Sequence, residues 1–181
     1  LLRESNIGWG SNYLDRGGTD IDMAYENLDK DRESQFLRRG VVRAIFSYIE
    51  AMIECVKVEI RSTIRAGLYT KNLTQKEQDT LGRLAIIGAP PGKFLPLDQN
   101  LKRTFKLASK VWALNFSLST DGEDFRDFLA AKKARNKLTH PRTVYDVEVN
   151  DDDMHCHTVA GMWVPPSVKV VGTPPDVRLS Q

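Results

Sequence analysis

An uninterrupted apolar stripe is the feature that most constrains the fold of this chain. Apolar residues recur at helical spacing between positions 42 and 60, namely Val42, Ile45, Phe46, Ile49, Ile53, Val56 and Ile60. Neither proline nor glycine interrupts residues 41–66. The spacing places these side chains on one face of a helix of above-average length, which other elements must cover. The stripe therefore predicts a helical bundle built around one long helix.

Three further segments carry helix signals. An apolar stripe of helical period runs through residues 98–116, and two matches to the capping box, Thr74-x-x-Glu77 and Thr120-x-x-Glu123, indicate helix starts. We therefore expect an all-α fold, an antiparallel bundle of four main helices near 40–66, 75–87, 98–116 and 122–138.

The segments that flank this core have weaker patterns. Glycines and acidic residues crowd residues 1–35, so we expect an irregular N-terminal arm with at most a short helix at Ile21–Leu28. Asn150 and the aspartates after it are typical of a helix N-terminus and predict a helix to about Trp163. Because prolines gather after that point, residues 164–181 are expected to be an extended or disordered tail. The central helical domain is thus expected to span residues 36–163.

Composition restricts the class of protein. A hydrophobic fraction of 41% and a charged fraction of 28% are typical of soluble globular proteins. No run approaches the roughly 18 apolar residues of a membrane span, so no membrane partner is expected. The sequence shows no signal peptide, although its start at Leu1 leaves a preceding leader open. Cys55 and Cys156 lie far apart, which favours a reducing, cytoplasmic location.

No cofactor or metal is expected. His155, Cys156 and His157 are too close in sequence to face one way on a helix, and no further ligand cluster stands nearby. Residues 84–93 look like a strand leading into a phosphate-binding loop, but Phe94 stands where Ser or Thr would bind magnesium. The adjacent prolines in that loop have no N–H to offer a phosphate. We interpret it as a helix–helix loop and do not expect nucleoside triphosphate hydrolysis.

The functional signal is concentrated between Lys132 and Arg142, where five residues are basic. Asn136 and His140 are four residues apart and so lie one above the other on a helix. Pro141 disfavours helix at the residue before it, which makes the basic motif coincide with a helix end. Basic residues outnumber acidic ones across residues 99–142, a distribution typical of a polyanion site, although solvated helix faces give the same pattern.

The phase of this helix also carries information. Its apolar face is defined by Phe125, Phe128 and Leu129, and polar residues continue that face, namely Lys132, Asn136, Thr139 and His140, with Arg135 at its edge. Ala131, Ala134 and Leu138 form another face that permits close helix packing. Because buried polar groups need partners, we expect the motif to lie in a cleft or a subunit interface.

Arg135-Asn136-x-x-x-His140 followed by proline resembles the R-polar-x-x-x-H signature of HEPN domains. These are small all-helical domains, and many are metal-independent endoribonucleases in bacterial toxin–antitoxin, phage-defence and RNA-processing systems. The resemblance covers about Arg39 to Met154. It implies an RNA substrate, a homodimer that brings two motifs together and, in a toxin, a cognate antitoxin.

The resemblance and the chemistry together suggest roles. Attack by the 2′-hydroxyl of the RNA needs proton transfer and stabilisation of the charge at phosphorus. We assign the proton transfer to His140, and Arg135 would stabilise the charge by binding the phosphate. Asn136 would orient the imidazole or a phosphate oxygen, and Glu50 is a supporting residue that would position Arg135. The RNA backbone would be held by Lys132, Lys137 and Arg142.

Two other functions stay open at this point. A non-catalytic HEPN-like module would bind RNA, a nucleotide or a protein partner through the same basic residues. A helical dimerisation protein would have no nucleic-acid partner, and the motif residues would then only cap helix carbonyls or pair with acidic side chains.

Overall fold

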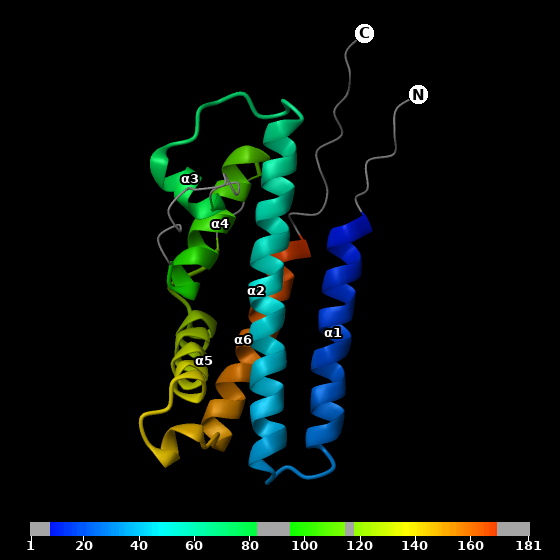
Figure 1. The fold of residues 1–181 in the computed structure, drawn as a ribbon, viewed down its shortest axis with the longest axis vertical. Helices are drawn as coiled ribbons and strands as arrows, with labels where there is room; N and C mark the ends of the chain where they lie inside the picture. The colour runs from blue at the N-terminus through cyan, green and yellow to red at the C-terminus, as the bar shows by residue number, and fades with distance from the viewer. Residues whose placement is uncertain (1–7, 83–94, 115–117, 170–181) are drawn as a thin grey trace, which may run out of the picture. The chain divides into compact units, whose positions relative to one another are not determined.

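A computed structural model describes residues 8–82, 95–114 and 118–169 (Figure 1). Over these ranges every regular element is a helix, which confirms the all-α class. The elements are α1 (Gly8–Leu28), α2 (Gln35–Arg65), α3 (Gln75–Leu81), α4 (Leu97–Val111), α5 (Glu123–Thr139), the short 3₁₀ helix η1 (Val144–Val147) and α6 (Asp151–Lys169).

The chain divides into two compact units that share α2. The first takes its residues from Leu1–Met52 and Thr120–Pro165, and so contains α1, the start of α2, α5, η1 and most of α6. The second takes its residues from Ile53–Ser119 and Pro166–Gln181, and contains the rest of α2 with α3 and α4. The predicted motif therefore lies wholly in the first unit.

The long helix expected from the apolar stripe is α2. Every residue of the stripe is buried, and the most accessible of them, Val56, is 6% exposed. In the first unit, Phe46 packs against Phe128 of α5, with ring centroids 6.4 Å apart. Gly161 of α6 lies against Ile45, whose side chain would contact a Cβ added there at 3.7 Å. The stripe thus forms the centre on which α5 and α6 pack.

Polar side chains at the start of α2 hold the segment that leads into α6. The amide of Gln35 donates to the Val149 carbonyl at 3.1 Å and accepts from the Val149 N–H at 2.8 Å. The buried Arg38 donates to the same carbonyl at 3.1 Å and pairs with Asp151 at 2.8 Å. Because a buried guanidinium needs such partners, these bonds fix the segment against α2.

The second unit corrects several expected boundaries. The capping box of Thr74 and Glu77 is present. However, α3 ends at Leu81 and not at the expected residue 87, because the next residue, Gly82, adopts a φ of 71°. Similarly, α4 ends at Val111 instead of 116, because Ala113 has a φ of 53°. The positive φ values break the helical hydrogen-bond pattern. The expected loop at 84–93 lies outside the described residues.

The expected irregular arm is also wrong, since α1 covers Gly8–Leu28. Its glycines each disfavour helix by about 1 kcal/mol, so local propensity does not predict it. Packing accounts for it instead: Leu28 is buried, and the Tyr25 hydroxyl lies 2.7 Å from the Thr158 hydroxyl of α6. Tertiary contacts of this kind supply most of the stability of helices in proteins.

Two further expectations fail at helix ends. The expected capping box at Thr120 is absent, because the N-cap of α5 is Gly122, without a side-chain hydrogen bond. An extended tail was expected from residue 164, but α6 continues to Lys169, so this expectation is wrong for residues 164–169. The helix continues past the prolines at 165 and 166, although proline lacks the N–H that a helical hydrogen bond needs and disfavours helix interiors. Residues 170–181 lie outside the described part of the chain.

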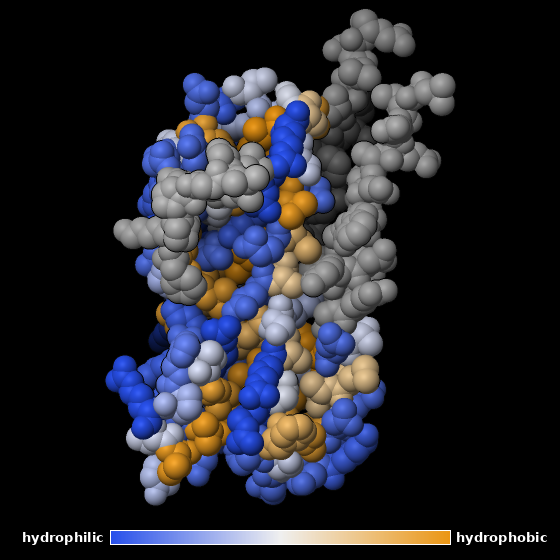
Figure 2. All heavy atoms as spheres, viewed as in Figure 1, coloured by the Kyte–Doolittle hydropathy of each residue, from blue (hydrophilic) through white to orange (hydrophobic). Residues whose placement is uncertain are grey.

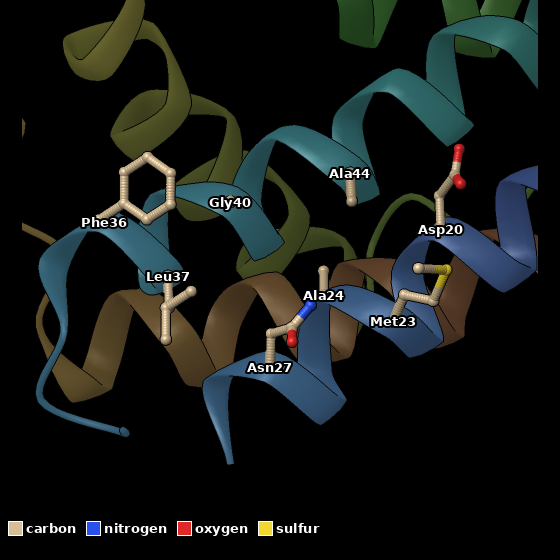
Figure 3. A pocket seen from close by; sticks show the side chains of 8 residues that line it. All are labelled: Asp20, Met23, Ala24, Asn27, Phe36, Leu37, Gly40 and Ala44. Atoms are coloured by element: carbon tan, nitrogen blue, oxygen red, sulfur yellow. The ribbon is translucent and has the colours of Figure 1, made fainter. Parts of the chain in front are cut away.

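Large apolar side chains also reach the surface (Figure 2), and two of them border a groove of about 360 Å³ in the first unit. Figure 3 shows its lining, which consists of Asp20, Met23, Ala24 and Asn27 from α1 and Phe36, Leu37, Gly40 and Ala44 from α2. The groove is open where Gly40 lacks a side chain, because a Cβ built at that position meets no atom within 4 Å.

Replacing Gly40 by alanine should therefore stabilise the protein. Gly40 lies inside α2 with open space around it, so the substitution removes backbone freedom from the unfolded chain without a clash. We expect the free energy of unfolding to rise by about 0.5–1 kcal/mol in urea titrations. The matched control is Gly67→Ala, which has equally open space but a φ of 73° and should destabilise by about 1 kcal/mol. Equal effects of the two substitutions would contradict this backbone assignment.

Candidate functional site

The motif lies at the C-terminal end of α5, as Pro141 led us to expect. The helix ends at Thr139, and His140 is its C-cap with φ −133° and ψ 64°. The backbone N–H of His140 still donates to the Asn136 carbonyl at 2.9 Å, so His140 makes the last helical hydrogen bond. The motif is therefore displayed on the rigid end of a packed helix.

Within the described chain, the buried face of α5 differs from the apolar face that the sequence predicted. The buried residues of α5 are Phe125, Phe128, Ala131 and Ala134. These residues recur every three positions, whereas one helical turn takes 3.6 residues. The buried stripe therefore shifts gradually around the helix, to the side of Arg135 and away from Leu129. The alanines permit the close packing that their small size suggested. As a result Asn136, Thr139 and His140 are exposed, and the motif is not enclosed in a cleft of the described chain.

Arg135 is the motif residue that the structure holds most firmly. Its guanidinium pairs with the Glu50 carboxylate of α2 at 2.5 Å and donates to the Asn136 side-chain oxygen at 3.3 Å. The guanidinium carbon also lies over the Phe46 ring, 5.9 Å from its centroid. Arg135 remains 30% exposed and Glu50 45% exposed, so the pair stands at the surface. Sequence reasoning chose Glu50 but missed Phe46, which had only a packing signal.

The other basic residues of the motif differ in their exposure. Lys137, His140 and Arg142 are exposed, and Lys132 is half-buried. Within the described ranges, the His140 imidazole has no hydrogen bond or ion pair, so the structure does not bring it against Arg135. The arrangement thus combines one anchored guanidinium with the exposed side chains of Lys137, His140 and Arg142.

Asp146 orders the turn that follows the motif. Its carboxylate accepts hydrogen bonds from the backbone N–H groups of Arg142 at 2.8 Å and Thr143 at 2.9 Å. These bonds, that of Arg142 first, lower the pKa of the Asp146 carboxyl below its ordinary value. Sequence reasoning missed this residue, although Thr143-x-x-Asp146 matches the capping-box pattern that the structure contains.

His157 of α6 is a second residue that sequence reasoning did not single out by itself. It is fully buried, and its ring meets Phe46 edge-on with centroids 5.6 Å apart. Its Nδ1 donates to the Asp153 carbonyl one turn earlier, whereas its Nε2 is buried without a partner. Burial is the main cause that lowers the pKa of His157. The neutral ring therefore suits this site, and protonation would place a charged N–H in an apolar core.

The neighbours of His157 do not form a metal site with it. His155 is exposed and Cys156 donates to the Asp127 carboxylate at 3.7 Å, so the three side chains face different ways. Burial, and then the charge of Asp127, raise the pKa of the Cys156 thiol. Among the residues that the structure describes, no group of three or more His, Cys, Asp or Glu side chains is arranged to hold a metal ion.

The groove between α1 and α2 shares none of the predicted site residues. Over the ranges that the structure covers, none of the helices has both the length and the apolar character needed to cross a bilayer.

No family model, curated protein or solved structure matches this chain.

The buried state of His157 predicts a pH dependence of stability. Its pKa is lowered in the folded protein from an ordinary value of 6.5, so its contribution to stability is complete above about pH 6.5 and is lost as the pH falls through the folded pKa. Urea unfolding between pH 7.5 and 5.5 should show a loss of up to about 1.4 kcal/mol per pH unit. His157→Leu should remove this loss. His155→Gln, at an exposed histidine, should keep it, and an unchanged slope in His157→Leu would refute the assignment.

Proposed function

We propose that this chain is a HEPN-like endoribonuclease with an antiparallel four-helix core, which cleaves RNA without a metal ion. The observation that carries the proposal is the anchored Arg135 guanidinium at the exposed, basic end of α5, one turn from His140. A guanidinium held from behind by a carboxylate keeps other N–H groups for a phosphate, which accepts hydrogen bonds in the same fork geometry.

The proposed reaction uses the RNA's own nucleophile. The 2′-hydroxyl oxygen bonds to the adjacent phosphorus while the bond from phosphorus to the 5′-oxygen breaks, leaving a 2′,3′-cyclic phosphate and a 5′-hydroxyl. One proton must leave the 2′-oxygen and one must reach the 5′-oxygen. The His140 imidazole is the side chain of the motif that can both accept and donate a proton, and its exposure leaves it open to the substrate.

Arg135 has the complementary role of charge stabilisation. Negative charge grows on the phosphate oxygens as the attack proceeds, and a prepositioned cation stabilises it without having to reorganise. Glu50 and Phe46 restrict the guanidinium from two sides, and both come from the long helix α2. Asn136 contacts the same guanidinium and would orient it or a phosphate oxygen. Lys132, Lys137 and Arg142 would attract the flanking phosphates.

A second copy of the chain completes this proposal. Each chain carries one motif, and its His140 has no enclosing wall within the described residues. A homodimer that places two motifs together would supply both a proton acceptor and a proton donor, and would exclude water from the phosphate.

A non-catalytic RNA-binding module is the second candidate. The observation that favours it is the His140 imidazole itself, which no described residue orients. General acid/base catalysis needs a positioned imidazole, whereas phosphate binding needs only the cations.

Activity on a mixed-sequence RNA separates the two candidates. In excess EDTA, the wild-type protein should produce 2′,3′-cyclic phosphate and 5′-hydroxyl ends. His140→Ala should lower the cleavage rate by about 10²–10⁴-fold while RNA binding persists, because only proton transfer is removed. The matched control is His155→Ala, at an exposed histidine outside the motif, which should cleave like wild type.

Each alternative outcome has a definite reading. Equal cleavage by wild type and His140→Ala would place the activity at another site or in a contaminant. Binding that depends on salt but lacks cleavage would favour the non-catalytic module. Sedimentation of the same preparations would report whether two copies associate at micromolar concentration.

The Glu50–Arg135 pair gives a second, structure-based prediction. Glu50→Gln removes the charge that holds the guanidinium, so Arg135 should lose its fixed orientation and cleavage should slow by up to about 10²-fold. The matched control is Glu59→Gln, an exposed carboxylate on the same helix without an ion pair among the described residues. Equal rates for Glu50→Gln and wild type would show that the pair is purely structural.

A further inference from the structure

The turn after the motif presents two large side chains to solvent. Val144 is 76% exposed and Tyr145 is 74% exposed, and both belong to η1. Single exposed apolar residues are common and carry no meaning by themselves. What distinguishes Tyr145 is the order of the backbone that carries it and the charge of its neighbours.

The backbone around Tyr145 is held on both sides. On the motif side, the Asp146 carboxylate binds the N–H groups of Arg142 and Thr143. On the other side, Arg39 of α2 donates to the Val147 carbonyl at 3.0 Å, and Glu148 donates its N–H to the Tyr145 carbonyl at 3.2 Å. A ring on such an ordered turn loses little freedom when a ligand stacks on it, which favours binding.

The exposed charged residues just before Tyr145 are basic, whereas the exposed Glu148 follows it. Tyr145 follows His140 by five residues and Arg142 by three, and the contact between Asp146 and Arg142 folds this segment into a tight turn. The Asp146 carboxylate is already occupied by backbone N–H groups. Exposed cations and an exposed aromatic ring therefore stand at the same end of α5, the combination that proteins use for single-stranded nucleic acid.

We propose that Tyr145 is a base-stacking residue and that the ligand of this site is single-stranded RNA. This inference takes RNA as the polyanion because it rests on the proposed ribonuclease function. An unpaired base would lie on the Tyr145 ring while its neighbouring phosphates meet Lys137, Arg142 and Arg135. Bases inside a duplex are stacked on each other, so double-stranded RNA cannot use this surface. The site thereby selects loops, ends and unpaired stretches.

Binding measurements test the proposal independently of cleavage. The His140→Ala protein serves as the parent, so that RNA stays intact, and the probes are a fluorescent 12-nucleotide oligouridylate and a 12-base-pair RNA duplex at one salt concentration. Tyr145→Ala should weaken oligouridylate binding by about 5- to 150-fold. Tyr145→Phe should restore it, because the ring is retained, and Val144→Ala, at the adjacent exposed side chain, should bind like the parent.

Salt dependence separates stacking from charge. Tyr145→Ala should leave the slope of log affinity against log salt unchanged, whereas Lys137→Ala should reduce it by about 0.7 for a single strand. Unaltered oligouridylate affinity in Tyr145→Ala, or duplex binding as tight as oligouridylate binding, would overturn the stacking role and leave the proposed ribonuclease standing. Absence of binding to both probes by the parent would overturn the stacking role together with the RNA-directed function.

Discussion

The first unit depends on the packing of one aromatic ring. Phe46 of α2 is buried against Phe128 of α5 and His157 of α6, and it also lies beneath the Arg135 guanidinium. The face of an aromatic ring attracts a cation, and its burial against other rings stabilises the core. The same side chain therefore joins two helices and supports the candidate site. For this reason the site is part of the core structure, and Arg135 cannot reorient freely while Glu50 and Phe46 stay in place.

The segment between α5 and α6 shows how a helical protein supplies hydrogen-bond partners to irregular backbone. The carbonyls of Val147 and Val149 have no helical partner, and a buried carbonyl without a hydrogen bond is costly. Side chains from the start of α2, those of Gln35, Arg38 and Arg39, supply the missing donors. Guanidinium and amide groups can reach across such a gap, whereas apolar residues would leave the carbonyls unpaired. The turn beside the motif is consequently tied to the longest helix of the chain.

The candidate site is an exposed helix end and not an enclosed pocket. In water, a single guanidinium–phosphate contact is weakened by solvent, so a binding or catalytic site of this kind gains strength from several cations and from a partner that excludes water. A second copy of the chain and the RNA itself both meet that requirement. His157, whose buried Nε2 has no hydrogen-bond partner, also contacts Phe46 but belongs to the core, where burial favours the neutral ring.

The sequence by itself determined the features that depend on neighbouring residues. The period of the α2 stripe, the capping box at Thr74 and the helix end before Pro141 follow from local sterics and local hydrogen bonds. Helix α1 could not be predicted in this way, because its glycines disfavour helix and its stability comes from packing. The buried face of α5 was predicted only in part: the small size of Ala131 and Ala134 indicated close packing, but the exposure of Leu129 depends on how the neighbouring helices pack. The sequence suggested Glu50 as a residue that would position Arg135, but the contact itself, between residues 85 positions apart, was decided by the tertiary structure, since contacts between distant residues arise from the packing of whole helices.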